Sequence, residues 1–360
     1  MSAPTRHRTP IVAALGALMI VATNAPAVAA AATMKILRPS TTNWRVLSTP
    51  SGVTAFSGVA CASSNICIAV GSDKSNGVIF ATSNGGSTWK QDRVAATGFA
   101  LLGIACPSTA ECFVVGSSLN KGGVVLRTVD GGAAWTRQTV PSTPYLASIT
   151  CRSTSECLAV GSGSSPVGVV VTTVNAGVTW KYYTGSSVAG AQYLSGIACV
   201  SSTTCLAVGG FEGTPNIIRT ANLGATWKSV AVPGNIQAVV SLACASASNC
   251  VAAGLNGAGS SGVILTSSNG GSSWVTRSSP ASLVADNGVA CASVSQCIAI
   301  GSNSKRSAAS VLASNNGGVS WTSQALPTQV KVLFGAACKS SCLAVGQTEA
   351  GGGLIAEGPS

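Results

Sequence analysis

Residues 101–135, LLGIACPSTAECFVVGSSLNKGGVVLRTVDGGAAW, contain one complete copy of the pattern that decides the fold. An apolar run ends at Cys106, a polar turn leads to Cys112, and a second apolar run follows. A small polar segment then precedes a third apolar run, and a tight turn leads to Trp135 at the start of a fourth segment. Short β-rich runs separated by turn residues, without helical periodicity, predict four β-strands.

The same pattern recurs along the chain. Tryptophans follow one another at steps of 45 to 47 residues, and six of seven close cysteine pairs have a gap of five residues. The tryptophans are Trp44, Trp89, Trp135, Trp180, Trp227, Trp274 and Trp321. A four-stranded unit repeated seven times predicts an all-β fold, a seven-bladed β-propeller of four-stranded antiparallel blades. A linear β-solenoid is the alternative architecture.

The two ends of the chain complete each other. The last copy stops after 353–357, before any tryptophan strand, whereas 42–47 around Trp44 has no cysteine pair before it. We therefore expect the N-terminal strand to supply the missing outer strand of the last blade. A ring closed in this way leaves no free sheet edge to aggregate.

The N-terminus has the features of a targeting segment. Arg6 and Arg8 precede an apolar run at 11–23, and small residues at 27–29 and 30–32 offer cleavage sites. This pattern predicts a secretory signal peptide over 1–32 that is removed, leaving one propeller domain over 33–360. The apolar run is too short for a membrane span, which needs about 20 residues. We expect a secreted or extracytoplasmic protein.

Composition excludes several kinds of chemistry. The single histidine, His7, lies in the predicted signal peptide, so histidine-based catalysis and histidine-ligated metals are excluded from the mature chain. No metal or cofactor is expected. With 46% hydrophobic and 8% charged residues, the chain is too apolar for disorder and too poor in charge for a coiled coil.

The cysteine pairs predict structural disulfides within the blades. Two cysteines six positions apart can face one another across the hairpin between the first and second strands. Closing so short a loop contributes about 2 kcal/mol per bridge, and an oxidising compartment suits this cysteine content. A metal or redox role is the alternative. The predicted bridges are Cys61–Cys67, Cys106–Cys112, Cys151–Cys157, Cys199–Cys205, Cys244–Cys250, Cys291–Cys297 and Cys338–Cys342.

A second signature precedes six of the tryptophans, as in Thr82-x-Asn84-x-Gly86-x-Thr88-Trp89. An Asn or Asp side chain can bond backbone N–H groups ahead of it, glycine supplies a positive φ, and tryptophan packs under the turn. The residues at these positions are Asn84, Gly86 and Trp89; Asp130, Gly132 and Trp135; Asn175, Gly177 and Trp180; Asn222, Gly224 and Trp227; Asn269, Gly271 and Trp274; and Asn316, Gly318 and Trp321.

This signature resembles the Asp-box (BNR) repeat of sialidases, sortilin-type receptors and certain glycoside hydrolases, with Asn in place of Asp in five of six copies. The resemblance implies that the box joins the third and fourth strands, away from the substrate. Boxes and disulfides then share one end of the ring, and ligands are expected at the other. That opposite end is predicted to include loops at 71–77, 116–122, 161–168, 209–215, 254–262, 301–309 and 346–352.

The resemblance also raises the possibility of a sialidase or a two-carboxylate glycosidase. Glu111 and Glu156 directly precede the second cysteine of their pairs, and Asp130 belongs to a box, so these carboxylates are assigned to the scaffold. No sialidase arginine or Tyr–Glu motif can be matched. A non-catalytic binding module is therefore preferred, and a glycoside hydrolase is the alternative. The candidates for the loop side are Asp73, Asp92, Glu212, Asp286 and Glu349.

Short propellers with this repeat are similar to the photosystem II stability/assembly-factor family, which implies a docking platform for assembly. Removal of Arg6 and Arg8 lowers the formal charge from +11 to +9, which favours anionic partners. The expected partner is an envelope protein or an anionic or glycan polymer. Nucleic acid is not expected, because no Lys/Arg cluster is interleaved with aromatic residues. A monomer is expected.

Overall fold

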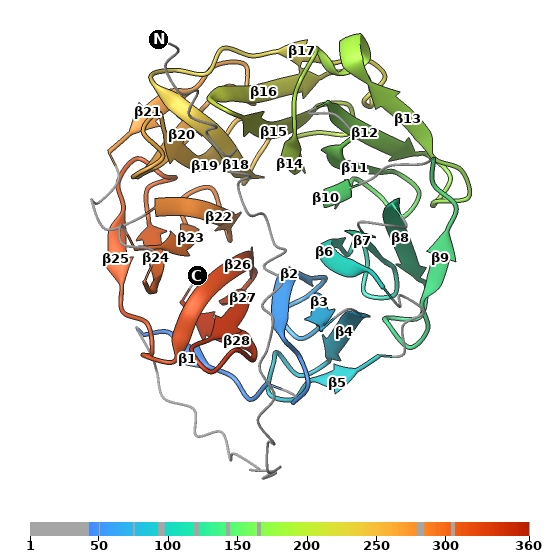
Figure 1. The fold of residues 1–360 in the computed structure, drawn as a ribbon, viewed down its shortest axis with the longest axis vertical. Helices are drawn as coiled ribbons and strands as arrows, with labels where there is room; N and C mark the ends of the chain where they lie inside the picture. Colours follow the sequence, from blue (N-terminus) through green and yellow to red (C-terminus); the bar gives the residue numbers. More distant parts are fainter. Residues whose placement is uncertain are drawn as a thin grey trace, which may run out of the picture.

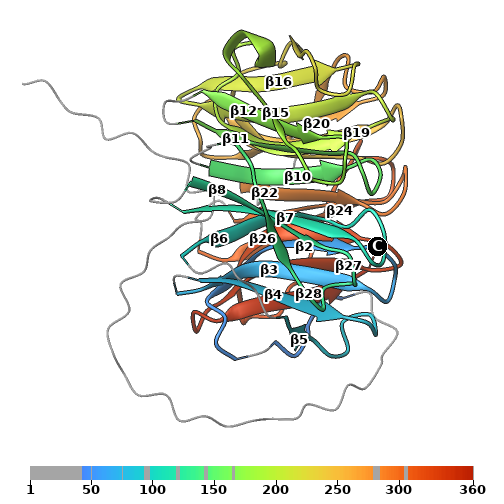
Figure 2. The same cartoon turned by 90° about the vertical axis from the view of Figure 1, so that its right-hand side faces the viewer.

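The computed structural model is a ring of seven four-stranded antiparallel sheets, as predicted (Figure 1). Seen edge-on in Figure 2, the strands run between the two ends of the ring. The structure describes residues 43–49, 51–74, 76–92, 98–118, 122–141, 145–163, 167–278, 284–303 and 307–359. The predicted signal peptide at 1–32 lies outside these residues.

From the axis outward, the first three blades are β2 (Ala55–Cys61), β3 (Cys67–Asp73), β4 (Asn76–Thr82) and β5 (Lys90–Gln91); β6 (Ala100–Ala105), β7 (Cys112–Ser118), β8 (Gly122–Thr128) and β9 (Thr136–Gln138); and β10 (Tyr145–Cys151), β11 (Cys157–Ser162), β12 (Gly168–Thr173) and β13 (Lys181–Thr184). The next two are β14 (Leu194–Cys199), β15 (Cys205–Phe211), β16 (Thr214–Thr220) and β17 (Lys228–Ser229); and β18 (Ile236–Cys244), β19 (Cys250–Asn256), β20 (Gly262–Ser267) and β21 (Val275–Arg277).

The sixth blade is β22 (Val284–Cys291), β23 (Cys297–Ser302), β24 (Ala309–Ser314) and β25 (Thr322–Gln324), and the seventh is β26 (Val330–Cys338), β27 (Cys342–Thr348), β28 (Gly353–Gly358) and β1 (Arg45–Val46). A short 3₁₀ helix, η1 (Gly185–Val188), connects the third and fourth blades.

The N-terminal strand closes the ring, which confirms the prediction. β1 pairs antiparallel with β28, with Arg45 opposite Glu357 and Val46 opposite Ala356. The Arg45 guanidinium forms an ion pair with the Glu357 carboxylate across this junction. Closure thus joins segments more than 300 residues apart through backbone pairing and one charged contact.

The hydrophobic core consists of layers between neighbouring blades. The second and third strands of the third blade, β11 and β12, are buried along their whole length. In the layer between the first and second blades, Ile68 and Val70 of β3 pack with Leu101 and Val114 of the next blade and with Trp135. Each blade therefore buries apolar residues on both faces, which explains the continuous apolar runs in the sequence.

In six blades the inner strand contains a β-bulge directly after a residue that lies opposite a glycine of the second strand, and in β22 the irregularity extends over 285–287. In the second blade the register shifts between Leu101 and Gly103, and Leu101 lies opposite Gly116. A Cβ atom on Gly116 would lie 2.0 Å from the carbonyl oxygen of Ala100. The glycine therefore lets the inner strand approach closely and does not end the second strand. Several loops that we predicted to start at these glycines begin later. In the second blade, for example, the predicted loop begins at 116, whereas β7 extends from Cys112 to Ser118.

Replacement of Gly116 by alanine is expected to destabilise the fold by about 3 kcal/mol, because the new methyl group overlaps the Ala100 carbonyl oxygen. Thermal and denaturant unfolding of the purified protein measure the change. Gly352→Ala is the matched control, since the nearest atom to its Cβ is 3.6 Å away. Equal stability of the two variants would contradict the role of the close approach.

Candidate functional site: the axial cavity and the two ends of the ring

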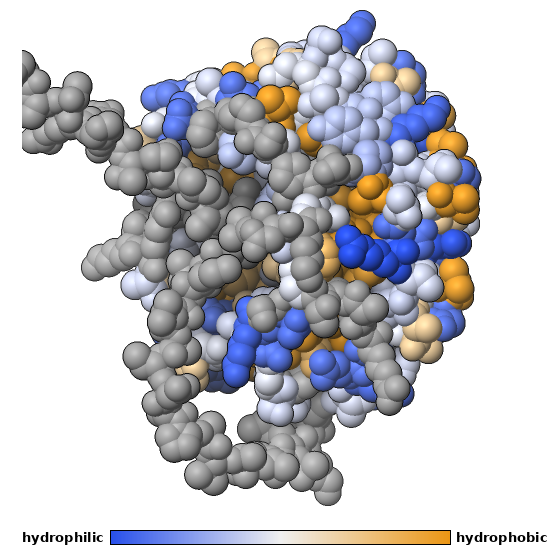
Figure 3. Space-filling model, turned by 45° about the vertical axis from the view of Figure 1, so that its right-hand side comes forward, coloured by the Kyte–Doolittle hydropathy of each residue, from blue (hydrophilic) through white to orange (hydrophobic). Residues whose placement is uncertain are grey.

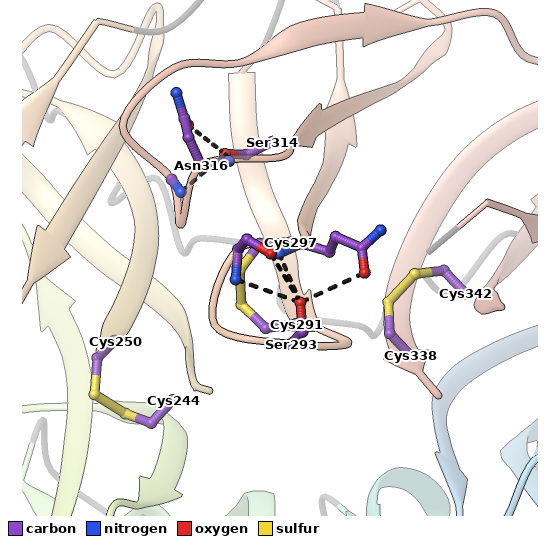
Figure 4. Close-up of a disulfide and its surroundings, with 12 residues drawn as sticks. Cys244, Cys250, Cys291, Ser293, Cys297, Ser314, Asn316, Cys338 and Cys342 are labelled. Carbon is purple, nitrogen blue, oxygen red and sulfur yellow. Dashed lines mark hydrogen bonds between the residues drawn. A yellow bond between two sulfur atoms is a disulfide. The ribbon is translucent and has the colours of Figure 1, made fainter. Parts of the chain in front are cut away.

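The disulfide end of the ring carries the seven predicted bridges, all of which are formed. Each joins a cysteine at the end of an inner strand, or directly after it in the case of Cys106, to the first residue of the second strand, as Cys61 and Cys67 do in β2 and β3. The paired Cα atoms lie 3.9 to 4.1 Å apart. Figure 4 shows three neighbouring bridges at this end. Seven intramolecular disulfides indicate an oxidising environment.

A serine shapes six of the seven cysteine turns, and our sequence analysis missed it. Ser293, between Cys291 and Cys297, accepts hydrogen bonds from the backbone N–H groups of Ser295 and Gln296 (Figure 4). The same hydroxyl position is occupied by Ser63, Ser108, Ser153, Ser201 and Ser246. The signal was visible as Cys-x-Ser in all seven copies, a spacing that favours a side-chain-to-backbone turn; the six turns named here lie in the pairs with a gap of five residues.

The six turns that resemble Asp boxes, here called box turns, lie at the same end. In the first blade the Thr82 hydroxyl donates to Asn84 Oδ1 (2.9 Å) and accepts from the N–H of Gly86 (3.0 Å). The N–H of Gly85 donates to the carbonyl oxygen of Asn65 in the cysteine turn (3.0 Å). Equivalent bonds tie every box turn to the cysteine turn of its own blade. This end is therefore a hydrogen-bonded scaffold.

The choice between Asn and Asp in a box turn matches the residue four positions later. Asn84 Nδ2 donates to the Thr88 hydroxyl (2.8 Å), and the other Asn copies have the same bond to Thr or Ser. The Asp130 side chain has no N–H to donate, and the residue four positions later is Ala134, which has no hydroxyl; the Ala134 backbone N–H donates to Asp130 Oδ1 (3.0 Å). This bond and the one from Thr128 hold the pKa of Asp130 below its ordinary value.

Among the described residues, the candidate carboxylates of the loop end lie on separate blades, and none lines the axial cavity. Asp73 ends β3 on the first blade, the exposed Glu212 lies between β15 and β16 on the fourth, and the exposed Glu349 follows β27 on the seventh. Asp286 belongs to β22, but its side chain lies outside the described residues. These positions are at the loop end, on separate blades.

Asp92 lies elsewhere, in the seam between the first two blades. Its Oδ2 accepts a hydrogen bond from the indole Nε1 of Trp135 at 3.4 Å, beneath the box turn that contains Gly132. Burial raises the pKa of Asp92 to about 6, although the bond from Trp135 and the charge of Lys90 lower it. The nearby negative charge of Asp130 raises it further.

Asp92→Asn is expected to stabilise the protein above pH 6 by about 1 kcal/mol, after allowance for solvent screening. The folded state binds the Asp92 proton more tightly than the unfolded state, so wild-type stability falls as pH rises from about 4 to 6. The variant keeps an acceptor for Trp135 and lacks this fall.

Melting temperatures measured from pH 4 to pH 8 test this expectation. Glu349→Gln is the control for the loss of one negative charge at an exposed site. An unchanged pH profile in the Asp92 variant would contradict it.

The described arginines act in the scaffold. Arg127 Nε bonds the Glu111 carboxylate at 2.7 Å, and Arg152 pairs with Glu156 at 3.3 Å. Arg219 Nε donates to the carbonyl oxygen of Gly270 (3.1 Å). Arg45 pairs with Glu357, Arg277 bonds Thr266, and Arg137 lies over the ring of Phe99. Among residues that the structure describes, no arginine cluster of the sialidase kind forms.

A cavity of about 220 Å³ lies on the axis of the ring. It is lined by three successive positions of the inner strands. The bulged residues form the bulge ring, which consists of Ser57, Leu102, Ala147, Ser195, Val240, Asn287 and Phe334. The next position forms the glycine ring of Gly58, Gly103, Ser148, Gly196, Ser241, Gly288 and Gly335. The apolar ring is Val59, Ile104, Ile197, Leu242, Val289 and Ala336.

The axial cavity is uncharged. None of its lining residues, all of which are described, carries a carboxylate, ammonium or guanidinium group. Tyr145 contributes a phenol, and burial raises its pKa to about 12, so it stays neutral at physiological pH. None of the described carboxylate candidates lines this cavity. The site offers hydroxyl, amide and apolar groups, which suit binding of a neutral group better than acid–base chemistry.

In the described part of the chain, no cluster of three or more His, Cys, Asp or Glu residues is arranged to hold a metal ion. The same part contains no helix long and apolar enough to cross a membrane. In the view of Figure 3, hydrophobic and hydrophilic residues are interspersed along the rim of the ring.

These features define a seven-bladed propeller with a disulfide-tied scaffold end and an uncharged axial cavity. The sequence matches no protein-family model and no curated protein. Solved structures with the same fold include YCF48 bound to a D1 peptide, at 16% identity and a TM-score of 0.63, with 89% of this chain and 96% of that chain covered. Streptogramin B lyase gives 11% identity, a TM-score of 0.65 and coverage of 88% and 97%.

The GH74 xyloglucanase from Xanthomonas campestris is also similar, at 12% identity and a TM-score of 0.62. The alignment covers 87% of this chain and 53% of the enzyme chain. At these identities the likeness shows a shared propeller fold. The predicted similarity to photosystem II assembly-factor propellers and glycoside hydrolases thus holds for architecture.

Proposed function

We propose that this protein is an exported, non-catalytic binding scaffold that docks a protein partner of the cell envelope at the loop end of its propeller. The observation that carries the proposal is the absence of charge from the axial cavity, while the described carboxylates at the loop end lie on separate blades. A two-carboxylate hydrolase needs both groups on one substrate bond. A docking surface has no such requirement.

Two further observations support docking. The described arginines are engaged in ion pairs, hydrogen bonds or a ring contact, so they do not form a carboxylate-binding cluster. One of the matched propellers, YCF48, is bound to a D1 peptide. The formal charge of +9 without the signal peptide favours an anionic partner surface.

Photo-cross-linking tests the docking surface. The photoreactive residue p-benzoylphenylalanine is placed at Glu212 or Glu349 at the loop end, and at Lys339 in a cysteine turn at the disulfide end; all three positions are exposed. In cells of the source organism, we expect a discrete protein adduct from the loop-end positions and none from Lys339. Adducts from Lys339 alone, or none from the loop end, would refute docking there.

A sugar-release assay tests the alternative of a glycoside hydrolase, which the fold of the GH74 enzyme keeps open. The mature chain from Thr33 is incubated with xyloglucan, sialosides and wall polysaccharides, and released sugar is measured. We expect none. Sugar release would contradict the scaffold proposal if it is lost in the combined variant Asp73→Asn, Glu212→Gln, Asp286→Asn, Glu349→Gln, and the protein would then be an enzyme. Asp92→Asn is the control, because this carboxylate lies in the seam between blades.

A further inference from the structure

The axial cavity changes in polarity along its depth. The bulge ring lies nearest the loop end, and the inner strands then run through the glycine ring and the apolar ring toward the cysteines. Successive strand residues rise by roughly 3.3 Å, so the lining changes from mixed to apolar within roughly 7 Å. That depth suits one side chain entering from the loop end.

The polar groups of the cavity are unequally engaged. The Ser195 hydroxyl donates to the carbonyl oxygen of Val240 (2.7 Å), and Ser241 Oγ accepts from the N–H of Val289 (3.1 Å). The Asn287 side-chain amide Nδ2 donates a hydrogen bond to the carbonyl oxygen of Leu333. These three side chains tie neighbouring blades together and are not free for a ligand.

Two of the serine hydroxyls that line the cavity remain. Ser57 and Ser148, on the first and third blades, line the cavity, and neither has a hydrogen-bond partner among the described residues. Between them, on the second blade, lies Leu102, and on the other side of Ser57 lies Phe334 of the seventh blade. Both large apolar side chains are only half-buried. Free hydroxyls beside accessible apolar groups suit a ligand that has amides next to an apolar side chain.

The volume limits the ligand to one such unit. An apolar cavity of about 150 Å³ holds a benzene molecule, so about 220 Å³ admits a single side chain and part of its flanking backbone. Each inner strand is also the edge of its sheet, and its unpaired side faces the axis. A charged side chain would lose its hydration here without gaining an opposite charge.

We propose that the axial cavity is a socket for one uncharged apolar side chain of the docked protein, of about the size of leucine, methionine or phenylalanine. The socket rests on the proposed docking function and adds the chemistry of the residue that anchors the partner. The apolar ring receives the side chain, and Ser57 and Ser148 bond the peptide groups on either side of it.

Single-residue probes test the socket without knowledge of the partner. N-acetyl-leucine N-methylamide is titrated into the mature chain from Thr33 and followed by saturation-transfer NMR, with the lysine and glutamate analogues as matched charged probes. We expect the leucine probe to bind at least tenfold more tightly than either charged probe. Equal binding of all three, or no binding of the leucine probe, overturns the socket.

A filled cavity provides the decisive variant. The double variant Ser57→Phe, Ala147→Leu introduces a phenylalanine and a leucine into the bulge ring. The fold already accommodates these residue types at the same position of other blades, as Phe334 and Leu102. We expect the double variant to melt near the wild-type temperature and to bind the leucine probe at least tenfold more weakly. Ser340→Phe, at an exposed turn of the disulfide end, is the control and should bind normally.

Phe334→Ser keeps the proposal falsifiable if the filled variant does not fold. Enlargement of the cavity should shift its preference by at least tenfold toward N-acetyl-tryptophan N-methylamide over the leucine probe. An unchanged preference overturns the socket. Unchanged binding of the leucine probe by a folded double variant also overturns the socket. If the loop-end cross-links persist in that variant, the docking proposal stands without the socket. Loss of both the cross-links and leucine-probe binding in that variant supports the docking proposal and the socket.

Discussion

The structure depends on one packing constraint: each blade has two apolar faces, and only its two neighbours can cover them. The inner and middle strands carry β-branched and small residues on both sides, and β11 and β12 are buried throughout. A single blade would leave both faces in water, and an open row of blades would leave one face exposed at each end, so the units are stable only as a closed ring. The pairing of β1 with β28 is therefore essential, since it completes the outer edge of the blade in which the chain ends meet.

Close packing around the axis also creates the candidate site. In the second blade, Gly116 admits the carbonyl oxygen of Ala100 so closely that no side chain fits, and the inner strand bulges beside it. The bulge turns Leu102 out of the ladder, where it lines the axial cavity. The repeated glycine thus has two effects. It lets the inner and second strands pack closely, and the bulge beside it exposes the bulged residue of the inner strand to the axis.

The chain distributes its few charges mainly to the scaffold. Three described ion pairs hold a strand junction or a cysteine turn, and Asp130 completes a box turn. With disulfides and box turns joined at the same end, the chemistry that varies between blades lies in the loop-end turns and the bulge ring. This division explains why the repeated motifs identify the architecture and reveal little about the ligand.

Repetition in the sequence alone determined the number of blades, the order of their strands, the cysteine pairs and the closing strand, because each depends on residues near in sequence or on the spacing of copies. The position of Asp92 could not be predicted in this way. Its contact, Trp135, is 43 residues away in the next blade, and sequence analysis assigned the carboxylate to the loop side. Gly116 was similarly taken for the start of a loop, since glycine favours turns, whereas its carbonyl neighbour comes from another strand. The neutrality of the axial cavity was also decided by tertiary structure, because it depends on which residues of each inner strand line the axis.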